Sequence, residues 1–304
     1  VQTGVSTSEY MAFNLAYGMA TGAFMSLAGV AGNFASIKPH LDMAAPIMKS
    51  VPESAGGKQV LEHCSGRIEM DNVTFRYAEG APAVLDDLSL KIRPGQSVGV
   101  VGKTGCGKST LMRLLLGFEK PQKGAVLYDG RDIETLDVAS LRRNIGTVLQ
   151  DGKLFTGDIF SNIVVAAPWL TMEDAWEAAE LAGIADDIRA MPMGMNTMVS
   201  EGAGGISGGQ RQRILIARAV APKPKVLFFD EATSALDNVT QRQVSEALDR
   251  MKCTRIIVAH RLSTIRACDR IIVLDGGRVV EDGTYEELCA LGGVFAELVE
   301  RQTM

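Results

Sequence analysis

The chain has 304 residues, of which 46% are hydrophobic and 22% charged, so it can form one or two packed cores and is neither disordered nor collagen-like. Its 31 basic and 36 acidic side chains give a net charge of -5, which offers no electrostatic reason for binding along a nucleic-acid backbone. The five cysteines include no C-x-x-C pair, which favours a reducing, cytosolic compartment over a disulfide framework.

The first part of the chain is a long uncharged stretch. No charged residue occurs from residue 10 to residue 37, which is longer than the roughly 20 apolar residues that a helix needs to cross a membrane. Gly18 and Gly22 form a G-x-x-x-G pattern that lets neighbouring helices approach closely. The stretch predicts a packed transmembrane helix over residues 1–38. Because small and polar residues dilute the apolar signal, a soluble helix that is buried or covered by a partner is the alternative.

The segment between Lys38 and Gly66 is rich in proline, glycine and scattered charge, which breaks the helical pattern and predicts a linker over residues 39–65. From residue 66 onward, short apolar runs alternate with stretches of helix-forming composition, as in an α/β fold with a mainly parallel sheet and crossover helices. The predicted strands are 67–77, 97–101, 226–229, 255–258 and 271–274, and the predicted helices are 109–116, 173–182, 208–219 and 240–251.

A glycine-rich loop lies directly between the predicted strand at 97–101 and the next helix. It reads Gly102-Lys-Thr-Gly-Cys-Gly107-Lys108-Ser109-Thr110, the phosphate-binding P-loop pattern in its required context. Glycines let the backbone aim N–H groups at phosphate oxygens, and the helix presents its positive end to the same anion. We expect Lys108 to reach the β- and γ-phosphates and Ser109 to bind Mg²⁺. The predicted nucleotide-binding residues of the loop are Gly102, Thr104, Gly105, Cys106, Gly107, Lys108, Ser109 and Thr110.

Two acidic residues end the predicted strand at 226–229. Asp230 and Glu231 follow it directly, at the carboxyl edge of the sheet where ligands of open α/β sheets gather. Seen alone, such a pair is often a solvated turn. Coupled to a P-loop, Asp230 is predicted to act on Mg²⁺ and Glu231 to orient or deprotonate the attacking water.

A third motif narrows the class of nucleotide hydrolase. Ile206-Ser207-Gly208-Gly209-Gln210 resembles the L-S-G-G-Q signature of ATP-binding cassette (ABC) proteins, and residues 66–304 are similar to one nucleotide-binding domain of that family. The resemblance implies a P-loop NTPase fold with a RecA-like core, an antiparallel β-subdomain and an α-helical subdomain at about residues 153–220, preceded by an N-terminal helix. Further matches, in family order, are Tyr77, Gln150, the stretch Ser234-Ala-Leu-Asp237 and His260.

The resemblance also implies roles for these residues. Tyr77 offers an aromatic face to adenine, Gln150 would ligate Mg²⁺ and orient water, and His260 would contact the γ-phosphate. Ser207, Gly208, Gly209, Gln210 and Asp237 would contact ATP held by a second copy, so that two domains close head to tail around two MgATP molecules.

The stretch at 154–163 looks like the L-F-x-G-T-I-x-x-N-I segment of exporter-type cassettes, and Glu201 resembles the acidic residue of the exporter X-loop. Asp158, Ile206 and Cys106 depart from the usual Thr, Leu and Ser. The order of helix, linker and cassette predicts the C-terminal part of a longer exporter.

The residues at 1–38 would be the last transmembrane helix of that exporter, in the cell inner (plasma) membrane, with the cassette on the cytoplasmic face. The narrower expectation for its cargo is a peptide or bacteriocin. The alternatives are a soluble cassette ATPase that acts on nucleic acid or ribosomes, and a non-hydrolysing cassette, which the presence of Glu231, Gln150 and His260 disfavours.

Overall fold

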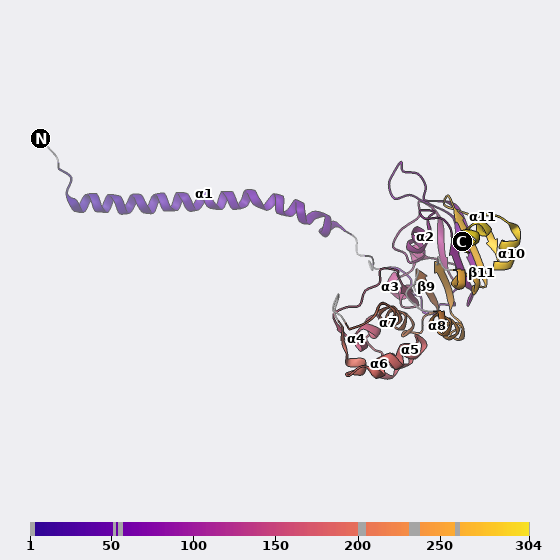
Figure 1. Ribbon diagram of the computed structural model, residues 1–304. Coiled ribbons are helices and arrows are strands. Elements are labelled where there is room, and N and C mark those ends of the chain that lie inside the picture. The colour runs from indigo at the N-terminus through magenta and orange to yellow at the C-terminus, as the bar shows by residue number, and fades with distance from the viewer. Residues whose placement is uncertain are drawn as a thin grey trace. The chain divides into compact units, whose positions relative to one another are not determined.

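The computed structural model describes residues 4–50, 53, 57–199, 205–230, 238–258 and 262–303. The chain divides into two units, Val1–Ala55 and Gly56–Met304 (Figure 1).

The first unit contains one long helix, α1 (Thr7–Lys49). The side chain of Ser6 caps its first turn, and the Ser6 N–H donates to the Glu9 carboxylate at 2.9 Å. Since α1 continues through Pro39 and Pro46, the prediction that the helical pattern breaks at residue 38 is wrong. A proline removes one backbone hydrogen bond and bends a helix without always ending it, and the alanines and methionines around Pro46 favour helix.

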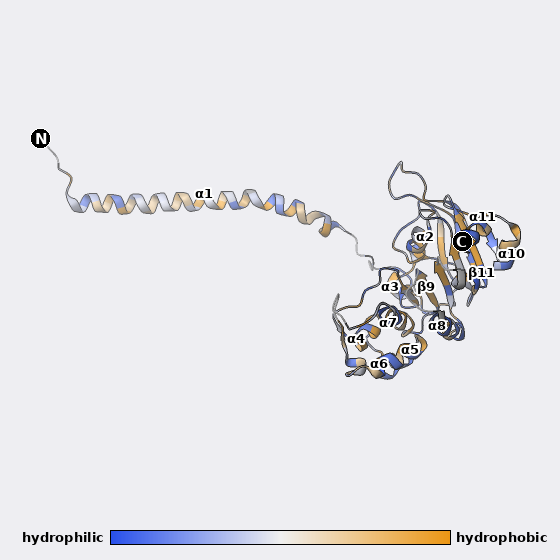
Figure 2. Ribbon diagram, viewed as in Figure 1, coloured by the Kyte–Doolittle hydropathy of each residue, from blue (hydrophilic) through white to orange (hydrophobic). Residues whose placement is uncertain are grey.

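Among the described residues, α1 is the one helix long and apolar enough to cross a membrane by length and composition, with a mean hydropathy of 1.3 in its most apolar window. Figure 2 shows hydrophobic residues recurring along most of its length.

The second unit is built on a six-stranded sheet in the order β12-β11-β3-β10-β9-β6. Strands β11, β3, β10, β9 and β6 are parallel, and β12 is antiparallel to β11. The bounds are β3 (Ser97–Val101), β6 (Ile145–Val148), β9 (Val226–Asp230), β10 (Thr254–Val258), β11 (Arg270–Asp275) and β12 (Arg278–Gly283). All five residues of β3 are buried, as expected for a central strand covered on both faces. The predicted mainly parallel sheet is confirmed.

A second, antiparallel sheet has the order β2-β1-β4-β5. Its strands are β1 (Ile68–Phe75), β2 (Leu85–Ile92), β4 (Lys123–Tyr128) and β5 (Arg131–Asp132). The buried faces of β1, β2 and β4 join one apolar core with β3 and the helix α2 (Lys108–Leu115). The short helices η1 (Ile133–Thr135) and α3 (Val138–Arg142) follow β5.

Helices α4 to α7 lie within the range 153–220 predicted for a helical subdomain, and they share one apolar core with residues of β6, β9 and α8 (Asn238–Arg250). Their bounds are α4 (Ile159–Val164), α5 (Met172–Leu181), α6 (Ala185–Ala190) and α7 (Gly208–Val220), with the short elements β7 (Gly157–Asp158), η2 (Gly194–Asn196) and β8 (Met198–Val199) between them. The remaining helices are α9 (Leu262–Arg266), α10 (Tyr285–Leu291) and α11 (Val294–Thr303). Figure 2 shows hydrophobic strands β9 and β11 inside the unit and hydrophilic residues on α6 and α8.

Candidate functional site

The loop between β3 and α2 has a backbone that requires glycine at Gly102 and Gly107. Gly102 has a φ of 152°, and a side chain there would collide with the carbonyl oxygen of Leu274. Gly107 caps α2 in the left-handed conformation with a φ of 107°, and no side chain caps the first turn. The first N–H groups of α2 are therefore left for an anion, as in other P-loops.

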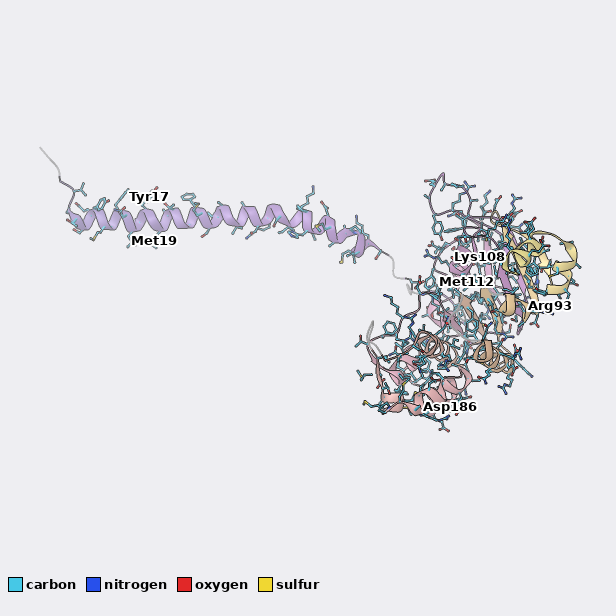
Figure 3. The ribbon with its side chains drawn as sticks, viewed as in Figure 1. Tyr17, Met19, Arg93, Lys108, Met112 and Asp186 are labelled. Carbon is cyan, nitrogen blue, oxygen red and sulfur yellow. The ribbon has the colours of Figure 1, made fainter. Side chains whose placement is uncertain are left out.

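Lys108, labelled in Figure 3, is the first residue of α2 and directly follows this loop. Its side chain is buried, and its Nζ donates to the carbonyl oxygens of Gly102 at 2.7 Å and Lys103 at 3.0 Å. These bonds hold the ammonium group inside the loop, so it is already positioned to bind a phosphate group. Cys106 is buried behind the loop, with Sγ 3.8 Å from the Lys108 Nζ, which agrees with a packing role for its side chain.

The loop forms one wall of a cavity of about 560 Å³ at the carboxyl edge of the main sheet. Gln150, which follows β6, and Asp230, which ends β9, form part of the opposite wall because the parallel register sets Val148 beside Phe229. The lining residues are Val84, Thr104, Gly105, Gly107, Lys108, Ser109, Thr110, Gln150, Asp230 and Val258. Of the predicted loop residues, Gly102 and Cys106 do not line the cavity.

The cavity brings together three oxygen donors predicted to act on Mg²⁺. They are the hydroxyl of Ser109, the amide of Gln150 and the carboxylate of Asp230. Mg²⁺ prefers oxygen ligands and is usually held by one or two carboxylates together with substrate phosphates. With one carboxylate, one amide and one hydroxyl, this donor set fits a metal shared with a phosphate ligand.

Tyr77 lies beside the cavity. Its hydroxyl is 3.0 Å from the Thr110 Oγ1, and its ring packs edge-to-face on Phe75 with centroids 4.9 Å apart. The residue is 54% exposed. An exposed aromatic ring fixed at both its hydroxyl and its edge is available for stacking on a base.

The signature residues Ser207–Gln210 do not line the cavity. Ser207 and Gln210 form a reciprocal capping box at the start of α7, and Gln210 donates to Asp187 at 2.7 Å. A side chain at Gly208 would meet nothing within 4 Å. Within the second unit, Figure 3 shows Lys108 and Asp186, a residue of α6, well apart. The start of α7, where Ser207 and Gly208 are exposed, therefore lies away from this cavity and presents the positive end of the helix at the surface.

A partly buried ion pair joins α7 to α6. Arg213 pairs with Asp187 at 2.8 Å and donates to the Gly183 carbonyl at 2.6 Å. Deeper along α7, Arg218 donates to the carbonyl and side-chain oxygens of Asn162, and burial lowers the pKa of its guanidinium. Both arginines therefore bond to groups inside the helical part.

Three predicted site residues, Glu231, Asp237 and His260, lie outside the described residues, as does Glu201. Sequence reasoning missed two wall residues, Val84 and Val258. Val258 ends a predicted strand of the parallel sheet, so its place at the ligand-binding edge could have been predicted from the sequence. No sequence pattern marks Val84, because only the fold brings it to the P-loop.

Comparison with known proteins adds three findings. Residues 85–234 match the family model described as ABC transporter. The chain is 43% identical over 298 residues to the cyclolysin secretion/processing ATP-binding protein CyaB of Bordetella pertussis, covering 97% of this chain and 42% of that protein. It is 42% identical to the alpha-hemolysin translocation ATP-binding protein HlyB of Escherichia coli O157:H7, covering 93% of this chain and 40% of that protein. The chain thus spans about two fifths of these curated relatives.

A solved structure is also similar to this chain in fold. The structure of a bacterial Atm1-family ABC exporter with ATP bound superposes with a TM-score of 0.84 at 36% identity, covering 93% of this chain and 51% of that chain.

Proposed function

We propose that this chain, of which residues 85–234 match the ABC transporter family model, contains an exporter-type nucleotide-binding domain that binds MgATP and hydrolyses it to power export of a protein across the inner membrane. The observation that carries the proposal is the cavity in which Lys108 and Ser109 of the P-loop face Gln150 and Asp230 from two other strand ends. The resemblance at 154–163 and the exporter with ATP bound support the transport class.

In the proposed complex, the phosphates lie in the loop. Lys108 would exchange its carbonyl partners for β- and γ-phosphate oxygens, and the N–H groups at the start of α2 would bind the same phosphates. Ser109, Gln150 and Asp230 would hold Mg²⁺, which neutralises charge on the phosphates when bound. Tyr77 would stack on the adenine ring.

For hydrolysis we assign Glu231 the role of orienting or deprotonating the attacking water, because it follows Asp230 directly at the cavity wall. We assign His260 to the γ-phosphate, because it follows shortly after Val258, another wall residue. Gln150 would contribute to both the metal and the water.

The outward position of the signature supports a second copy as partner. Ser207, Gly208, Gly209 and Gln210 cannot serve the cavity of their own chain from where they lie, but their exposed helix start suits the γ-phosphate of ATP in another copy. We propose that two cassettes close head to tail, with Asp237 at the same interface, and reopen after hydrolysis.

We further propose that α1 is the last helix of a membrane domain and that the cassette lies on the cytoplasmic side. The length and composition of α1 support this assignment. The names of the relatives refer to toxins: cyclolysin, alpha-hemolysin and toxin RTX-I. A protein cargo therefore replaces the narrower expectation of a peptide or bacteriocin, which the comparisons do not confirm.

The direct test is titration calorimetry of the purified chain with ATP and Mg²⁺, followed by measurement of phosphate release. We expect saturable binding that depends on Mg²⁺, and turnover that rises with protein concentration as copies pair. A folded chain with no affinity for MgATP would refute the proposal.

A further inference from the structure

Residues 59–64, which we call the strap, form part of the cassette. The Gln59 N–H donates to the Thr135 carbonyl at 2.9 Å, and the Gln59 carbonyl accepts from the Asp137 N–H at 2.8 Å. The side chain of Leu61 is 4% exposed, and its N–H donates to the Ser140 Oγ at 3.0 Å. The prediction of a linker extending to residue 65 is therefore wrong at its C-terminal end, because an apolar side chain and three backbone groups anchor the strap.

The strap packs on α3, which has five residues (Val138–Arg142). A helix this short has too few internal hydrogen bonds to hold its own conformation, so its position depends on the groups that pack around it. Leu61, Leu136 and Leu141 share one buried cluster. Ser140 both accepts from the strap and donates to the Asp137 carbonyl at 2.7 Å.

On its other side, α3 connects to both walls of the nucleotide cavity. Arg142 donates to the carbonyls of Leu116 and Gly117 at 3.3 and 3.4 Å, at the C-terminal end of the P-loop helix α2. The chain then passes from α3 into β6, whose last residue is two before Gln150. Close-packed interiors transmit small displacements rather than absorbing them.

We infer that the strap is a positioning element of the nucleotide site, and that Leu61 and Ser140 set the placement of Gln150 through α3 and β6. The inference rests on the proposed function, because Gln150 is assigned there to the metal and the attacking water. Neither residue touches the cavity. Their removal therefore affects the geometry of hydrolysis more than the affinity for ATP, which is set by the P-loop itself.

The test uses the full chain with Leu61→Ala and Ser140→Ala, each measured for kcat, KM for ATP, MgATP affinity and Tm. Two variants serve as controls: Val60→Ala removes an exposed neighbour in the strap, and Ser140→Thr keeps the hydroxyl. Because displacement of about 1 Å at a reacting centre can cost about 100-fold in rate, we expect kcat to fall at least about fivefold in Leu61→Ala and Ser140→Ala. We expect the MgATP affinity of these variants to change less than about twofold, and both controls to stay near wild type.

The inference is overturned if Leu61→Ala and Ser140→Ala lower Tm but keep the kcat of Val60→Ala, or if kcat and affinity fall together. Should Leu61→Ala fail to fold, the comparison of Ser140→Ala with Ser140→Thr still decides, because both changes are small. Failure of the proposed function gives a different result, in which the wild-type chain itself does not hydrolyse ATP.

Discussion

Replacing Lys108 with Met tests the site most directly. Met has a similar length and keeps the apolar stem of the side chain, but it removes the ammonium that donates to the Gly102 and Lys103 carbonyls. Both carbonyls belong to a loop bordering an open cavity, so water can replace the lost donor. We therefore expect Lys108→Met to fold.

The magnitude follows from the bond that ATP would lose. A hydrogen bond to a charged group contributes about 1.5–3 kcal/mol net. Lys108 must give up its bonds to the two carbonyls when it binds phosphate. We therefore count the loss of binding free energy in Lys108→Met as one charged hydrogen bond rather than two. Since about 1.4 kcal/mol equals tenfold in affinity, the Kd for MgATP should rise about 10- to 150-fold.

The assay is calorimetric titration of wild type, Lys108→Met and the matched control Lys103→Met. Lys103 carries the same charge in the same loop but is exposed and does not line the cavity. The control should bind within about threefold of wild type, since an exposed charge contributes little. If Lys108→Met also bound MgATP that well, the assignment of this cavity to the phosphates would be refuted.

Three further predictions address catalysis, stability and pH. Glu231→Gln should abolish phosphate release while retaining MgATP binding, because the amide keeps the shape but cannot take a proton; unchanged turnover would exclude Glu231 as the base. Tyr128→Phe should lower the free energy of unfolding in urea by about 1–3 kcal/mol, because the buried hydroxyl donates to the Leu115 carbonyl at 2.7 Å and its loss leaves that carbonyl unsatisfied. The exposed Tyr17→Phe is the control and should leave stability unchanged. Burial raises the pKa of the Cys268 thiol to about 11, so this thiol stays almost wholly protonated at pH 8. Its alkylation in the native protein should therefore be slow at pH 8 and rise steadily as the pH increases toward 11; rapid labelling of Cys268 at pH 8, located by peptide mass spectrometry, would contradict this.

Much of the candidate site could be predicted from contiguous residues. The P-loop glycines, Lys108 and Ser109 carry their chemistry in their spacing, because a strand, a tight turn and a helix start are local structures. The same holds for Asp230 at the end of a buried apolar run. Alternation of apolar runs and helix formers likewise predicted the parallel sheet, which the structure confirms.

Predictions based on composition were less successful. Proline and charge after residue 38 indicated a linker, yet α1 continues to Lys49 because two prolines remove few of its many hydrogen bonds. Residues 59–64 also carry no helix or strand pattern, and only their contacts with α3 show that they belong to the cassette.

By itself, the sequence determined that the chemistry is nucleotide phosphate binding, because this function depends on a local motif, the P-loop, whose backbone geometry few other sequences adopt. Only the tertiary structure decided which motifs share a cavity. The register of β6 beside β9 sets Gln150 near Asp230, and the fold brings Val84 to the P-loop. The packing of α7 among the other helices leaves Ser207 outside the cavity. The physical reason is that strand pairing and core packing join residues far apart in the chain, and no local pattern specifies such contacts.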